Sequence, residues 1–181
     1  MLNMTDLLIG TRLSTYARTL NLICLHFESG DGTIYCLHSQ CLLRIMKDKS
    51  LIASSNDVYN PCTAFNGDID EWDWSEQVGE TLYDEGMKKG LSEALPLRVL
   101  SVSFGKCGDI FLELEQGYSI EIIVTTVTDD ESWRFFQMLH AEEITFVYSG
   151  DESYSIGISN PLKPVTVPDI AERSTGLAHR T

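Results

Sequence analysis

The stretch that decides the fold is residues 22–40, which read LICLHFESGDGTIYCLHSQ. Two runs rich in β-branched and aromatic residues flank the tetrapeptide SGDG at 29–32, and Gly and Asp favour tight turns between antiparallel strands. A loop centred on Asp31 places Phe27 opposite Tyr35. Because successive side chains of a strand alternate between its two faces, one face of this hairpin is apolar and buried. That face carries Ile23, Leu25, Phe27, Tyr35 and Leu37.

Further strands are predicted after this hairpin. Residues 41–46 and 51–54 extend it into a meander, and a second group of strands spans 97–104, 110–115, 118–126 and 144–149. Apolar residues at helical spacing predict one main helix from Ser75 to Ala94, which ends before Pro96. Residues 129–138 are expected to form a short helical turn, in which Trp133 and one of the two following phenylalanines anchor the core.

These elements predict an α+β fold, in which a mainly antiparallel sheet of hairpins and a meander carries one main helix. A chain of 181 residues is long enough to bury a core without disulfides or metal. We expect one domain over residues 1–150. Residues 151–181 are polar and contain Pro161, Pro164 and Pro168, which is typical of a tail or arm.

The charge of the chain departs most from the average for globular proteins. The chain has 27 acidic and 13 basic residues, so its formal net charge is -14. A net negative field repels nucleic acid and attracts basic proteins. Five cysteines without a repeated spacing and no cationic, apolar leader indicate a reducing, cytoplasmic location. No apolar run approaches the ~20 residues that span a membrane, so no membrane partner is expected.

Soft metal ligands meet on the first hairpin, since its register sets Cys24 opposite His38 and His26 opposite Cys36. Zinc requires tetrahedral geometry, usually with two ligands in a tight knuckle, and flat cross-strand neighbours rarely supply it. We therefore expect no metal and no cofactor. Nucleophilic catalysis by a cysteine with His38 or His140 has no local support either, because no cysteine lies at an evident helix N-terminus that would lower its pKa. The sequence thus favours a protein without catalytic activity.

Residues 55–77 are punctuated by Asn, Asp and Gly and predict a long irregular loop, a kind of segment that is often functional. Its acidic run surrounds two tryptophans, which either fold down as a lid on the core or contact a partner. The candidate partner-binding residues are Asp68, Asp70, Glu71, Trp72, Asp73 and Trp74. Similar exposed carboxylates have similar pKa values, so this run is not typical of acid–base catalysis.

A second candidate site consists of His38, Gln40 and Arg44, which share one face of an ideal strand. This arrangement is consistent with a polar pocket for a small molecule between the sheet and the helix. The structural alternative is a buried network in which Arg44 pairs with Asp57 or Asp73, because buried arginine is normally paired.

The motif L-H-x-Q-x3-R-I at residues 37–45 resembles that of a widespread, largely uncharacterised family of small bacterial cytosolic proteins. The resemblance covers roughly Ile9 to Val147. The family usually has an aromatic residue before the Arg, where this chain has Leu43. The resemblance implies a fold and a bacterial or phage origin, and it implies no activity. Further matches are Asp57, Tyr59, Pro61, Asp73, Trp74, Tyr83, Asp84, Glu85, Pro96, Leu97, Val99, Glu131, Trp133, Arg134 and Phe135.

Two functional hypotheses follow. The first is an acidic binding protein, similar in character to the immunity proteins of bacterial toxin systems, which neutralises a basic toxin domain such as a nuclease. The second is a small-molecule-binding protein or enzyme that uses the pocket around His38, Gln40 and Arg44.

Overall fold

The computed structural model describes residues 3–75, 79–138, 143–151 and 154–159. Within them, eleven strands form one sheet in the order β11-β10-β9-β3-β2-β1-β6-β7-β8-β4-β5, and every pairing is antiparallel. The strands are β1 (Arg12–Thr19), β2 (Leu22–Glu28), β3 (Ile34–Ser39), β4 (Leu42–Lys47), β5 (Ser50–Ser54), β6 (Leu97–Phe104), β7 (Ile110–Leu114), β8 (Tyr118–Ile123), β9 (Glu131–Met138), β10 (Glu143–Ser149) and β11 (Tyr154–Ser159). The helices are α1 (Met4–Leu8) and α2 (Leu82–Gly90), and three 3-10 turns are η1 (Ser55–Tyr59), η2 (Ile69–Glu71) and η3 (Glu115–Gly117).

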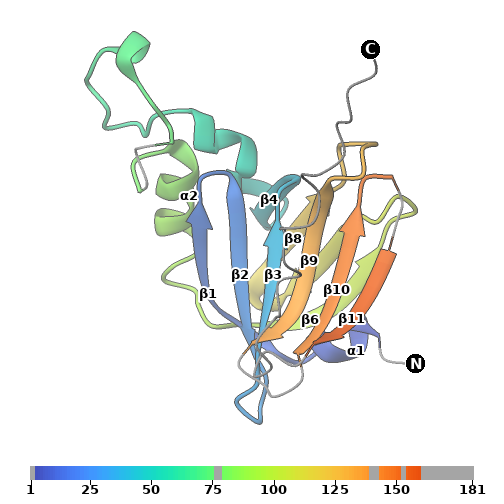
Figure 1. Ribbon diagram of the computed structural model, residues 1–181. Coiled ribbons are helices and arrows are strands. Elements are labelled where there is room, and N and C mark those ends of the chain that lie inside the picture. Colours follow the sequence, from blue (N-terminus) through green and yellow to red (C-terminus); the bar gives the residue numbers. More distant parts are fainter. Residues whose placement is uncertain (1–2, 76–78, 139–142, 152–153, 160–181) are drawn as a thin grey trace, which may run out of the picture.

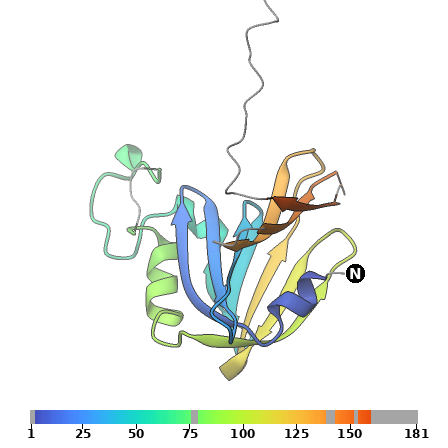
Figure 2. The same cartoon turned by 60° about the horizontal axis from the view of Figure 1, so that its bottom comes forward.

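The sheet folds over on itself into two layers. Strands β1, β2, β3, β9, β10 and β11 form the front layer in Figure 1, and β6, β7, β8 and β4 lie behind it. Strand β6 connects the layers because Leu97 pairs with Leu13 of β1, after which β6 continues beside β7. Figure 2 shows the same bend from below. The core lies between the layers, where Leu25, Leu37 and Ile120 are buried.

The expected α+β class is wrong, since the fold is largely all-β. The predicted helix over Ser75 to Ala94 is reduced to the nine residues of α2. Residues 76–78 lie outside the described residues, and Thr81 is extended as the N-cap, where its side chain accepts a hydrogen bond from the amide of Asp84. A cap of this kind starts a helix at the residue after it, whatever the apolar spacing upstream.

The register predicted for the first hairpin is confirmed. Phe27 of β2 pairs with Tyr35 of β3, and Cys24 pairs with His38. The predicted meander is wrong, because β4 pairs with β8 and β5 in the other layer and not with β3. Strand β3 lies instead beside β9, so the chain crosses between layers at residues 40 and 41.

Residues 131–138 form strand β9, and the helical turn predicted over 129–138 is wrong. Trp133 and Phe135 point into the core while Arg134 between them is exposed, a period of two that is typical of a strand. The prediction that Trp133 anchors the core is confirmed, since it is 1% exposed. Beyond β10, strand β11 extends the sheet to Ser159, past the boundary expected at residue 150.

Helix α2 packs closely on the edge strand β5. A Cβ atom on Gly86 would lie 2.4 Å from the carbonyl oxygen of Ile52, and one on Gly90 would lie 2.3 Å from the Ile52 side chain. The two glycines, four residues apart, therefore share the helix face that meets β5. At the other side of α2, Arg18 of β1 donates two hydrogen bonds to Asp84.

Candidate functional site: an acidic arm

Residues 60–75, here called the arm, project from the sheet at one corner of the molecule (Figure 1). The base of the arm is held against the segment that leads into α2. The amide of Cys62 donates to the carbonyl of Glu80 at 2.9 Å, and the amide of Leu82 donates to the carbonyl of Asn60 at 2.9 Å. A loop whose ends lie close together and are fixed by hydrogen bonds is an Ω-like loop, a frequent carrier of function.

Glu85 of α2 adds a side-chain anchor to this base. Its carboxylate accepts hydrogen bonds from the amide and the hydroxyl of Thr63, both at 2.7 Å, and it forms an ion pair with Lys89. The hydrogen bonds from Lys89 and Thr63 lower the pKa of Glu85 to about 2. The anchor is therefore ionised at neutral pH.

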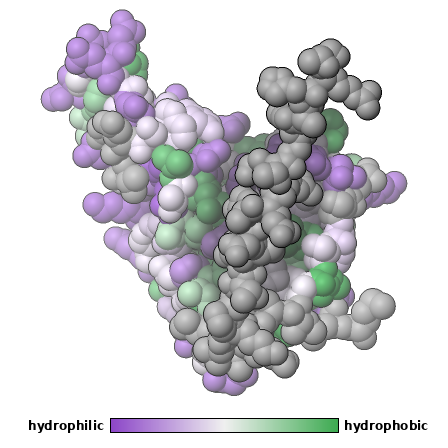
Figure 3. Space-filling view, in the orientation of Figure 1, coloured by the Kyte–Doolittle hydropathy of each residue, from purple (hydrophilic) through white to green (hydrophobic). Residues whose placement is uncertain are grey.

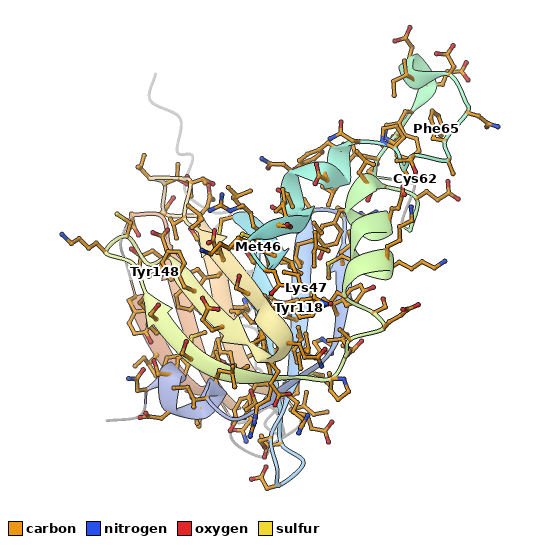
Figure 4. The ribbon with its side chains drawn as sticks, turned by 180° about the vertical axis from the view of Figure 1, so that it is seen from behind. Met46, Lys47, Cys62, Phe65, Tyr118 and Tyr148 are labelled. Atoms are coloured by element: carbon orange, nitrogen blue, oxygen red, sulfur yellow. The ribbon has the colours of Figure 1, made fainter. Side chains whose placement is uncertain are left out.

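The interior of the arm is aromatic. The rings of Phe65 and Trp72 meet edge to face at 4.8 Å, and Tyr59 of η1 meets Trp74 in the same way at 4.8 Å. The Phe65 ring also packs on the backbone at Gly67, where a Cβ atom would lie 2.8 Å from it. Figure 4 shows Phe65 and Cys62 on the arm, well away from the core. Both indoles are half-buried, and neither is among the side chains packed against the core, so they do not form the lid that was one of the two expectations.

The outside of the arm is acidic. Asp68, Asp70, Glu71 and Asp73 are exposed, and hydrophilic residues cover the projecting end of the molecule in Figure 3. Asp68 caps η2 by accepting from the amide of Asp70 at 3.0 Å. Hydrogen bonds from Ser75 lower the pKa of Asp73, which favours its charged form. The structure thus brings together all six candidate partner-binding residues.

Two features of this site were not identified from the sequence. No Lys or Arg occurs between Lys49 and Lys88, so the arm belongs to a long stretch without basic residues. Ile69, at the start of η2, is 60% exposed and places an apolar side chain among the acids. The pattern Asp-Ile-Asp at 68–70 was the available signal, because it sets one apolar side chain between two acids of the predicted loop.

The second candidate site is not assembled. His38 lies on β3, where its ring meets Phe136 edge to face at 4.8 Å, and Arg44 lies on β4 in the other layer. Arg44 forms an ion pair with Glu121 of β8, and not with Asp57 or Asp73 as expected. Gln40 is exposed and lines a cavity of about 290 Å³ that neither His38 nor Arg44 reaches. Burial and the charge of Arg134 lower the pKa of His38, so its imidazole is neutral at pH 7.

Burial makes the thiols on and next to the first hairpin less reactive. Burial raises the pKa of Cys36 to about 11, and burial also raises the pKa values of Cys24 and Cys41. Protonated thiols are poor nucleophiles. Among the described residues, no three His, Cys, Asp or Glu side chains are grouped to hold a metal ion. His140, the remaining candidate partner for a catalytic cysteine, lies outside the described residues.

Comparisons with models of known protein families, with curated proteins and with solved structures gave no match. In the part of the chain that the structure describes, no helix combines the length and the apolar character needed to cross a membrane.

Proposed function

We propose that this protein is a non-catalytic acidic binding protein that uses its arm to engage and neutralise a basic protein. The observation that carries the proposal is the arm itself. It projects from the sheet, it is fixed at its base, and it displays Asp68, Asp70, Glu71 and Asp73 around exposed Ile69.

The acidic and the apolar side chains of the arm have separate roles in this mechanism. The carboxylates act before contact, because a field of one sign accelerates the approach of an oppositely charged partner. Ile69 and the half-exposed tryptophan rings act after contact, because apolar side chains removed from water slow dissociation. The aromatic interior holds the arm in one shape, which reduces the entropy lost when it binds.

A cytoplasmic immunity role fits this chemistry best. A nuclease toxin needs a cationic active site to hold phosphates, and an ordered row of carboxylates matches such a surface. The alternative pocket around His38, Gln40 and Arg44 has no comparable support, since these side chains lie on different elements and face different surroundings.

Affinity capture with matched charge variants tests the proposal. The arm variant carries Asp68→Lys, Asp70→Lys and Glu71→Lys. The control variant carries three charge reversals at exposed positions elsewhere, Glu28→Lys, Glu113→Lys and Asp129→Lys, so both variants have the same net charge. We expect a protein of strongly basic pI to be retained from bacterial lysate by the wild type and the control, and lost by the arm variant. Equal retention by both variants, or retention of acidic proteins only, refutes the role of the arm.

Binding kinetics with the captured protein then separate the two roles. The arm variant should slow association and flatten its dependence on salt, since exposed charges are screened over about 8 Å at physiological ionic strength. Ile69→Ala and Trp74→Ala should mainly increase the dissociation rate, by a factor of about 30 for a side chain worth roughly 2 kcal/mol. Unchanged rates in all three variants contradict the mechanism.

A further inference from the structure

A concave site lies on the opposite side of the molecule from the arm. In Figure 4, Tyr148 lies beside the turn between β6 and β7, far from Cys62 and Phe65. A cavity of about 300 Å³ opens there between this turn and strands β9 to β11. Its lining includes four aromatic side chains and one cation, which are Phe104, Trp133, Tyr148, Tyr154 and Lys106.

The floor of the cavity is closely packed. Trp133 is almost completely buried, and its indole N–H donates to the carbonyl of Gly108 at 2.8 Å. The Tyr148 ring stacks on Trp133 with centroids 5.6 Å apart and an interplanar angle of 10°. Gly108 has a φ of +81°, and a Cβ atom there would lie 2.3 Å from the Tyr148 ring. The turn therefore needs glycine both for its conformation and to approach this ring.

The walls are aromatic and incompletely covered. Phe104 at the end of β6 is 43% exposed, and Tyr154 at the start of β11 is 50% exposed. Both ring centroids lie 6.4 Å from that of Trp133, on two different strands. Rings arranged around a preformed apolar space favour a flat guest, because aromatic faces and edges attract each other beyond the burial of area.

Lys106 gives the mouth of the cavity a positive charge. It follows Gly105 in the β6–β7 turn, is exposed, and forms no ion pair among the described residues. An ammonium group beside an apolar slot attracts an anionic substituent on a ring held inside it. The volume is at the lower end for ligand sites, which restricts the guest to one or two fused rings.

We propose that this cavity binds a small, flat aromatic carboxylate, with the ring between the exposed rings of Phe104 and Tyr154 and the carboxylate near Lys106. This site shares no residue with the arm. Its chemistry is recognition only, and no bond is made or broken.

Isothermal titration calorimetry with the full-length protein tests the proposal, with 2-naphthoate as the probe and 2-naphthalenemethanol as its neutral counterpart. We expect saturable one-to-one binding of 2-naphthoate. Tyr154→Ala and Phe104→Ala should each weaken it about two- to tenfold, the range for one aromatic contact. Lys106→Gln should weaken 2-naphthoate about two- to fivefold, as for an exposed charge pair, and leave 2-naphthalenemethanol unchanged. Leu51→Ala, at an exposed apolar site on β5, is the matched control and should bind as the wild type does.

Absence of saturable binding to wild-type protein overturns the proposal. Equal weakening of both probes by Lys106→Gln overturns the assignment of a carboxylate. Undiminished binding by both aromatic variants overturns the location. Near-ultraviolet circular dichroism verifies that each variant retains the wild-type environment of Trp133.

Discussion

Replacing Asp84 by Asn should destabilise the fold strongly. This carboxylate accepts two hydrogen bonds from Arg18, at 2.9 Å from Nε and 2.6 Å from Nη2, so that it links α2 to β1. It also accepts from the hydroxyl of Thr81 at 2.8 Å and from the amide of Gly79 at 2.9 Å. One side chain therefore holds the N-terminus of the helix, the end of the loop that leads into it, and the guanidinium of Arg18.

The burial of Arg18 determines how much stability the Asp84→Asn variant loses. The Arg18 side chain is only 2% exposed, so its charge cannot be rehydrated when the carboxylate is removed. Breaking a buried ion pair by changing one partner costs about 3 to 5 kcal/mol. Asp84 retains some exposure, and the lower half of this range is expected. For a chain of this length each kcal/mol lowers Tm by roughly 2 to 4 °C, so the melting temperature should fall by about 6 to 16 °C.

The pH dependence adds a second test. Burial alone would raise the pKa of Asp84, but the hydrogen bonds from Arg18 and Thr81 and the charge of Arg18 outweigh it and lower the pKa below its ordinary value of 3.8. A depressed pKa in the folded state contributes stability above the unfolded pKa, and this contribution is lost as the pH falls through the folded pKa. The difference between wild type and Asp84→Asn should therefore be full at pH 7 and shrink below about pH 4.

Urea denaturation at pH 7 and at a series of acidic pH values measures both effects. Arg18→Met, alone and combined with Asp84→Asn, completes a double-mutant cycle that isolates the pair. A loss below about 1 kcal/mol at pH 7, or a difference that does not change with pH, would falsify the assignment of Asp84 as the link between helix and sheet.

Four further outcomes are expected. Trp133→Ala should cost about 3 to 5 kcal/mol in urea denaturation, and a loss under about 1 kcal/mol contradicts its place in the core. Tyr83→Phe should leave stability unchanged or raise it by about 1 kcal/mol, because its buried hydroxyl has no hydrogen-bond partner among the described residues; a clear loss reveals such a partner. Gly86→Ala should destabilise the fold by about 1 to 3 kcal/mol because the added methyl meets the Ile52 carbonyl. Helix propensity alone favours alanine by about 1 kcal/mol, so a gain in the free energy of unfolding contradicts the close contact with β5. Elemental analysis should find no stoichiometric zinc, and one equivalent that disappears in Cys36→Ser contradicts this.

The sequence predicted the parts of the fold that depend on neighbours along the chain. The SGDG turn and the alternation around it determine the register of β2 and β3, because a slip of one residue would turn the apolar face outward. Whether β4 continues beside β3 or crosses to β8 depends on contacts far along the chain, and local pattern carries no information about that choice. The Arg44–Glu121 pair was missed for the same reason.

The same difference between residues that are neighbours in the chain and residues that are distant in it applies to the candidate sites. Asp68 to Trp74 are contiguous, so their composition predicted that they act together. His38, Gln40 and Arg44 were grouped on the assumption of a continuous strand, and the crossing at residues 40 and 41 separates them. The aromatic cavity combines Phe104, Trp133 and Tyr154 from three strands, and nothing in their sequence spacing indicates that they meet.

The closed base of the arm has a consequence for how this protein can diversify. The base is held by backbone hydrogen bonds and by Thr63–Glu85, and the arm's ring contacts involve its own residues and Tyr59. Substitutions at the exposed positions 68–71 therefore remove no core contact, and changes of this kind usually alter stability by less than about 0.5 kcal/mol. The charge and shape of the arm at residues 68–71 can vary under selection while the sheet stays constant. Under the proposed function, the choice of partner can therefore change by mutation at these positions while the fold is retained.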